Sequence, residues 1–145
     1  MKMLIDGDAC PSISLIEKTA IKYNIPIIIF CDTSHNISSI YSKVVITDKE
    51  SQSVDIKLVN EVCNNDIVIS QDYGVASMVL AKNAYCISPK GLIFTKDNID
   101  NLMLNRYINQ KLRSSGKRIK GPKKRCIEDD KKLIESLEKI ILLNI

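Results

Sequence analysis

The chain has 145 residues, the commonest length of one domain, so we expect residues 1–145 to share a single core. No stretch approaches the roughly 20 apolar residues of a membrane span, and the first apolar run begins without a cleavable signal pattern, so we expect a cytoplasmic protein without a membrane partner. The net charge of +4 is modest, and the five scattered cysteines, none in a CxxC pair, argue against a disulfide framework or a thiolate zinc site.

Short apolar runs alternate with amphipathic stretches over the first ninety residues. Strands are predicted over 2–5, 27–30, 44–46, 67–70 and 84–87. Helices are predicted over 11–23, over 54–63 with Ser53 as its cap, and over 74–82. The run 27–30 is apolar on both faces, which is typical of a strand covered by helices on either side. The alternation therefore predicts an α/β fold of three layers, with a parallel, Rossmann-like sheet, flanking helices and right-handed crossovers.

The pattern changes after residue 91 to a C-terminal helical extension. One helix is expected to begin at Asp97 or Asn98 and to run to about residue 112. A last helix is expected over 129–143, capped by Asp129 or Asp130. We place both helices in the same domain because no linker or internal repeat separates them from the sheet.

The positive charge is concentrated in one segment. Residues 101–127 contain nine Lys and Arg residues and no Asp or Glu, so the rest of the chain is net acidic. A Lys-rich composition is also typical of an A/T-rich genome, and surface charge usually serves only solvation. The complete absence of acids favours an anionic partner for the basic loop, 113–127. The candidate phosphate-binding residues are Arg113, Lys117, Arg118, Lys123, Lys124 and Arg125.

Four aspartates follow the predicted strands at their carboxyl ends. Asp6 and Asp8 come after the first strand, Asp55 lies in the first turn of the helix after the third, and Asp72 follows the fourth. Loops converge at this edge of an open α/β sheet, so we expect these side chains to lie together. Asp66 precedes its strand and is expected in a turn at the opposite edge.

Carboxylates gathered in this way repel one another unless a hard divalent cation neutralises them. Mg²⁺ or Mn²⁺ held by Asp6, Asp8, Asp55 and Asp72 would suit phosphodiester hydrolysis, with Asp6, Asp8 and Asp72 as catalytic residues. The alternative interpretation is that Asp6, Asp8 and Asp55 are turn and helix-cap residues. Cys10, at a predicted helix start, is favoured as a packing residue over a nucleophile, and the single histidine, His35, makes a histidine-based triad or zinc site difficult.

Several short motifs stand out along the chain. The first is the opening Asp6-Gly7-Asp8-Ala9-Cys10-Pro11. Others are Ser53-Val54-Asp55, the segment from Asp66 to Asp72, Ser88-Pro89-Lys90-Gly91, Arg113-Ser114-Ser115-Gly116 with Gly121-Pro122, and Asp130-Lys131. Together they resemble the YaiI/YqxD family of bacterial proteins, whose members open with D-x-D-A-C-P and are generally assigned to the PIN-like nuclease folds. The sequence departs from the family pattern at Ser88, Lys90, Lys120 and Tyr73-Gly74, none of which is a candidate ligand.

The resemblance implies a PIN-like fold and a metal-dependent nuclease, with RNA favoured as the nucleic-acid partner. Two other functions stay open. A D-x-D turn after a first strand also suits haloacid-dehalogenase-like phosphohydrolases, although Cys10 stands where that motif usually carries Thr or Val. A non-catalytic nucleic-acid-binding module would keep the fold and the basic loop without cleaving. Metal-dependent cleavage distinguishes the nuclease from both.

Overall fold

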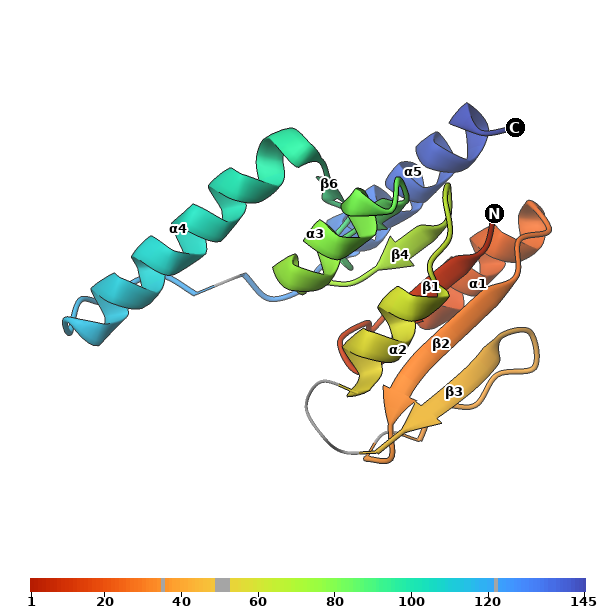
Figure 1. Ribbon diagram of the computed structural model, residues 1–145, viewed down its shortest axis with the longest axis horizontal. Helices are drawn as coiled ribbons and strands as arrows, with labels where there is room; N and C mark the ends of the chain where they lie inside the picture. The colour runs from red at the N-terminus through yellow and green to blue at the C-terminus, as the bar shows by residue number, and fades with distance from the viewer. Residues whose placement is uncertain (35, 49–52, 122) are drawn as a thin grey trace.

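The computed structural model describes residues 1–34, 36–48, 53–121 and 123–145, with Ser53 described by its backbone alone. His35, Pro122 and the predicted capping role of the Ser53 side chain therefore lie outside the described residues. Six strands form one sheet in the order β3-β2-β1-β4-β5-β6 (Figure 1). They are β1 (Met3–Asp6), β2 (Ile27–Asp32), β3 (Lys43–Thr47), β4 (Ile67–Ile69), β5 (Tyr85–Ile87) and β6 (Ile93–Phe94).

Strands β1 to β5 are parallel, and β6 pairs antiparallel with β5. The parallel sheet is therefore confirmed, while the short antiparallel strand β6 was not predicted. The chain adds β2 and β3 on one side of β1 and then β4 and β5 on the other. This reversal makes the carboxyl ends of β1 and β4 the switch point of the sheet, where ligands bind in open α/β folds.

Within the described ranges, five helices flank the sheet and extend from it. They are α1 (Ile13–Lys22), α2 (Ser53–Glu61), α3 (Tyr73–Ala81), α4 (Lys96–Ser114) and α5 (Ile127–Leu143). Alternate residues of each strand serve the two faces: Met3 and Ile5 pack with α1 and α5, whereas Leu4 packs with α2 and α3. The three-layer α/β class predicted from the pattern is confirmed. Across the described residues, no helix is long and apolar enough to cross a membrane.

Several helix boundaries differ from the predicted ones because caps were misassigned. Helix α4 begins at Lys96, since the Thr95 hydroxyl accepts the Asn98 N–H and the Asn98 side chain accepts the Thr95 N–H. Helix α5 begins at Ile127 with Cys126 as its cap, so Asp129 is the third helical residue and accepts the Cys126 N–H. Helix α1 begins at Ile13 rather than Pro11, and α2 ends at Glu61.

Helix α4 projects from the body of the protein. Ile99 in its first turn is buried, but every residue from Met103 to Lys111 is exposed. Figure 1 shows α4 extending away from the sheet and the following segment returning to the start of α5. The C-terminal extension predicted from the sequence therefore includes an arm, which is connected to β6 at one end and to α5 at the other.

Gly91 fixes the turn between β5 and β6 against α5. Its φ of +90° is unfavourable for other residues, and a Cβ there would lie 2.6 Å from the Lys132 carbonyl carbon. The Gly91 carbonyl also accepts the buried Ser136 hydroxyl at 2.6 Å. The turn is consequently held in place beside the carboxyl edge of the sheet.

Candidate active site at the carboxyl edge

The structure brings the four predicted aspartates to one edge of the sheet, here called the acidic edge (Asp6, Asp8, Asp55 and Asp72). Asp6 is the last residue of β1, and Asp8 lies in the turn after it. Asp55 is in the first turn of α2, and Asp72 is the N-cap of α3. Asp6, Asp8 and Asp55 are half-buried, whereas Asp72 is exposed.

Local hydrogen bonds hold two of these carboxylates. One oxygen of Asp72 accepts the N–H groups of Gly74 at 2.8 Å and Val75 at 3.2 Å, and so caps α3. One oxygen of Asp8 accepts the Asp32 N–H at 3.3 Å, which links the turn after β1 to the end of β2. Asp72 therefore caps α3, a role that was not predicted for it, and its second oxygen takes no part in capping.

The acidic edge raises the pKa of its own members. Burial, followed by the negative charges of Asp55 and Asp8, raises the pKa of Asp6 from 3.8 to about 6. Burial and then the charge and hydrogen bonding of Asp72 raise the pKa of Asp55. Carboxylates perturb one another in this way only at short range, so the four side chains form one electrostatic cluster.

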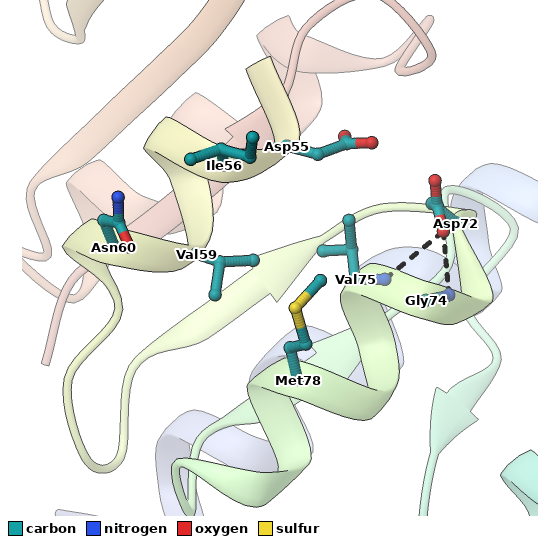
Figure 2. Close-up of a pocket in the computed structure, with 8 residues that line it drawn as sticks. All are labelled: Asp55, Ile56, Val59, Asn60, Asp72, Gly74, Val75 and Met78. Atoms are coloured by element: carbon teal, nitrogen blue, oxygen red, sulfur yellow. Dashed lines mark hydrogen bonds between the residues drawn. The ribbon is translucent and has the colours of Figure 1, made fainter. Parts of the chain in front are cut away.

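A pocket of about 320 Å³ lies between α2 and α3, with Asp55 and Asp72 at its rim. Figure 2 shows the Asp55 carboxylate extending toward the side on which Asp72 lies, while Val59, Val75 and Met78 fill the space between the helices. The floor is apolar and the rim is acidic. Low polarity beneath the carboxylates strengthens the repulsion between them.

A second hollow of about 430 Å³ is a neighbour of the first, because Asp72 lines both. It is lined by Asp6, Ala9, Gln71, Asp72, Tyr73 and Arg106. Arg106 comes from α4 and places its guanidinium carbon 5.7 Å from the centre of the Tyr73 ring. A cation and two carboxylates thus face the same space.

A third hollow of about 530 Å³ shares the lining residues Ala9 and Gln71 with the second. The three neighbouring hollows along the acidic edge are together called the groove. The third hollow is lined on one side by Asp8 and Cys10 and on the other by Lys90 and Arg125. Cys10 is buried, and burial raises the pKa of its thiol, which favours packing over a nucleophilic role.

The donors of the acidic edge suit a hard divalent cation, because all are carboxylate oxygens. Within the described parts of the chain, no three Asp, Glu, His or Cys side chains converge closely enough to hold a metal ion as they stand. The donor chemistry fits Mg²⁺ or Mn²⁺, and Asp6, Asp8, Asp55 and Asp72 are the residues that would hold it. Their role as metal ligands stays a prediction.

Asp66 lies at the opposite edge, as predicted. Its carboxylate, 3% exposed, accepts the Lys2 and Cys63 N–H groups and forms an ion pair of 2.6 Å with the Lys2 ammonium. It ties the turn before β4 to the start of β1. Asp66 therefore has a structural role separate from the acidic edge.

Five of the six predicted phosphate-binding residues are exposed: Arg113, Lys117, Arg118, Lys123 and Lys124. Arg125 differs. Its guanidinium is 2.6 Å from both the Asp130 carboxylate and the Pro89 carbonyl, and its side chain is only 20% exposed. These bonds make Arg125 an anchor of the basic loop, because its donors already have protein partners.

Three residues of the groove were not singled out as site residues from the sequence: Tyr73, Lys90 and Arg106. Tyr73 follows Asp72 directly, and Arg106 belongs to the acid-free segment, yet the two are brought together only by the packing of α4 on α3. The sequence pattern placed Arg106 on a helix and gave no indication that this helix reaches the carboxyl edge.

Residues 4–143 match the family model described as "Uncharacterized BCR, YaiI/YqxD family". The chain belongs to the YaiI/YqxD family. A "UPF0178 protein" of Clostridium kluyveri is 54% identical over 142 residues, which cover 98% of this chain and 93% of that protein. A "UPF0178 protein" of Clostridium tetani is 49% identical over 137 residues, covering 94% of both chains. The resemblance recognised from the sequence motifs is thus confirmed.

One solved structure resembles this YaiI/YqxD protein at a distance. The crystal structure of Rae1 (YacP) from Bacillus subtilis has a TM-score of 0.45 and 14% sequence identity, with 99% of each chain covered. A likeness at this level carries no conclusion about shared chemistry. The site therefore has to be judged from its own residues.

Proposed function

We propose that this YaiI/YqxD protein is a metal-dependent nuclease that hydrolyses phosphodiester bonds, preferably in RNA, at the acidic edge. The observation that carries the proposal is the gathering of four carboxylates from separate elements at the switch point of a parallel sheet. Repulsion among them destabilises the fold unless a cation relieves it. The PIN-like class implied by the family resemblance supports the same chemistry.

In this proposal Mg²⁺ or Mn²⁺ bound at the acidic edge would activate water and stabilise the charge on the scissile phosphate. Asp6, Asp8 and Asp72 act as catalytic residues, and Asp55 completes the ligand set. Asp72 lines the groove, and only one of its two carboxylate oxygens is used for capping. The capping bonds fix the Asp72 carboxylate in orientation, which favours a preorganised site.

The basic loop supplies the attraction for a polyanion. Arg113, Lys117, Arg118, Lys123 and Lys124 are exposed, and Arg125 anchors the end of the segment beside the third hollow. Side chains of this kind bind phosphates without reading bases, so we expect binding that is tolerant of sequence and sensitive to salt.

The test combines Mn²⁺ calorimetry with cleavage of a single-stranded RNA by the same preparations. The wild type is compared with the double variant Asp6→Asn/Asp72→Asn, in which Asn keeps the cap of α3. A matched control, Glu61→Gln/Glu135→Gln, removes two exposed acids away from the acidic edge. We expect Mn²⁺ binding and cleavage in the wild type and the control, and neither in the double variant.

A non-catalytic RNA-binding module is the second candidate, favoured by the incomplete convergence of the carboxylates among the described residues. This candidate predicts that the protein binds RNA and does not cleave it, whichever divalent metal ion is added. Turnover of small phosphate esters without RNA cleavage would instead indicate the haloacid-dehalogenase-like phosphohydrolase.

A further inference from the structure

Three cations line the groove beside the acidic edge, and two of them already have protein partners. Arg125 is paired with Asp130 and the Pro89 carbonyl, and the Lys90 ammonium donates to the Lys123 carbonyl at 2.7 Å. For Arg106, the described residues offer a single partner, the Tyr73 ring. Arg106 is therefore the cation whose N–H donors stay available to a ligand.

The packing around Tyr73 holds Arg106 in place without using those donors. The Tyr73 ring meets the Phe94 ring edge-on, with centroids 5.7 Å apart and an angle of 74° between the ring planes. The Arg106 guanidinium lies over the same Tyr73 ring. A guanidinium that lies over a ring keeps its planar fork of donors free for a carboxylate or a phosphate.

The partner of Arg106 can be identified from what lines the same hollow. Asp6 and Asp72 are there, yet no ion pair joins Arg106 to a carboxylate in the described parts of the chain. A phosphate bridges such an arrangement, because its oxygens accept from the guanidinium on one side while a cation at the carboxylates holds the other. The two non-bridging oxygens of a phosphodiester divide between the two sides in this way.

We propose that Arg106 binds the phosphate of a single-stranded polynucleotide beside Asp6 and Asp72, and that Tyr73 positions its guanidinium. This inference rests on the proposed function for the identity of the substrate. It assigns to α4 a part in the site: the arm carries a binding residue to the acidic edge in addition to supporting the basic loop.

The chain offers a matched control on the same helix. Lys111 also lies over a tyrosine ring, with its ammonium 5.5 Å from the Tyr107 centroid, but it does not line the groove. Arg106→Gln and Lys111→Gln each remove one α4 cation that lies over a tyrosine ring. Only Arg106→Gln removes a cation that lines the hollow beside the acidic edge.

The first measurement is the affinity for a twelve-nucleotide single-stranded RNA in the presence of Ca²⁺, a divalent cation that carboxylates bind, by fluorescence anisotropy at several salt concentrations. We expect Arg106→Gln to weaken binding by about tenfold, the usual scale of a charge-assisted contact, and Lys111→Gln by less than about threefold. Arg106→Lys should recover part of the loss because it keeps the charge, and Tyr73→Leu should weaken binding with Arg106 still present.

The second measurement is RNA cleavage in Mn²⁺, together with the melting temperature of each variant. We expect kcat/KM to fall by about tenfold or more in Arg106→Gln, with melting temperatures of Arg106→Gln and Lys111→Gln that agree. Equal RNA affinity in these two variants would overturn the proposal, as would the absence of RNA binding by the wild type. Wild-type binding that depends on Arg106 without any cleavage would support Arg106 as a phosphate-binding residue and refute the nuclease.

Discussion

Arg125 lies 2.6 Å from the Asp130 carboxylate, and this ion pair fastens the end of the basic loop to the first turn of α5. The Asp130 carboxylate also accepts the Ser12 hydroxyl at 2.9 Å, so the same bond network reaches the segment before α1. The hydrogen bond from Arg125, followed by the one from Ser12, lowers the pKa of Asp130. Because Arg125 also donates to the Pro89 carbonyl, three segments distant in sequence meet at this ion pair.

Replacing Arg125 is expected to lower stability, because Asp130 and the Pro89 carbonyl would lose their donors. We expect Arg125→Gln to melt a few degrees below the wild type, and Lys124→Gln, which removes an exposed charge, to melt at the wild-type temperature. Thermal denaturation of both variants at equal salt concentration provides the measurement. Equal melting temperatures would show that Arg125 is an ordinary member of the basic loop.

Asp6→Asn is expected to stabilise the metal-free protein near pH 7.5. The pKa of Asp6 in the folded protein, about 6, lies above its ordinary value of 3.8. The stability that the protonated carboxyl group contributes is therefore fully present below about pH 3.8, and it is lost as the pH rises through 6. After a reduction for partial exposure, we expect a gain of about 1 to 2 kcal/mol at pH 7.5 in urea denaturation. The gain should vanish near pH 4, and a variant less stable than the wild type at both pH values would contradict the repulsion.

Asp66→Asn should have the opposite effect. The substitution removes the ion pair with the Lys2 ammonium. It also replaces one acceptor oxygen by an amide NH₂ group, which cannot accept the backbone N–H groups of Cys63 and Lys2. We expect a loss of about 2 to 4 kcal/mol in the free energy of unfolding. RNA cleavage at a temperature where the variant is folded should stay unchanged. Loss of cleavage in folded Asp66→Asn would mean that the acidic edge is not the only part of the chain that the reaction requires.

Mn²⁺ affinity should fall as the pH is lowered, because a carboxyl group must lose its proton to bind a metal ion. With the pKa of Asp6 at about 6, we expect binding about tenfold weaker at pH 5 than at pH 7.5. Calorimetry across this range measures the effect, with protein concentration and ionic strength held constant. An affinity that is the same at both pH values would exclude Asp6 from the ligand set.

The arrangement of the sheet was predictable because each parallel strand is a short apolar run followed by a break. Ile67, Val68 and Ile69 are fully buried, and no other local structure suits such a run between two helical segments. Strand β6 has only two residues, so no period could be recognised in it. It forms because the turn at Gly91 returns the chain alongside β5.

The acidic edge was predictable for the same reason, since the carboxyl ends of parallel strands share one edge. The contribution of α4 was not. Arg106 reaches Tyr73 through the packing of two helices, and no pattern along the chain specifies which face of α4 meets α3. The role of Arg125 was also hidden, because its partner Asp130 was expected to cap a helix that instead begins at Ile127.

The raised pKa of Asp6 bears on how this family can change over time. A carboxylate at that position weakens the metal-free fold, whereas Asp72 would be retained for its capping bonds even in a chain without a ligand. In a chain without a ligand, random substitution should therefore replace Asp6 well before Asp72. Under the proposed function, family members that lack nuclease activity are expected to carry Asn or Ser at the position of Asp6 and to keep an acid or amide at that of Asp72.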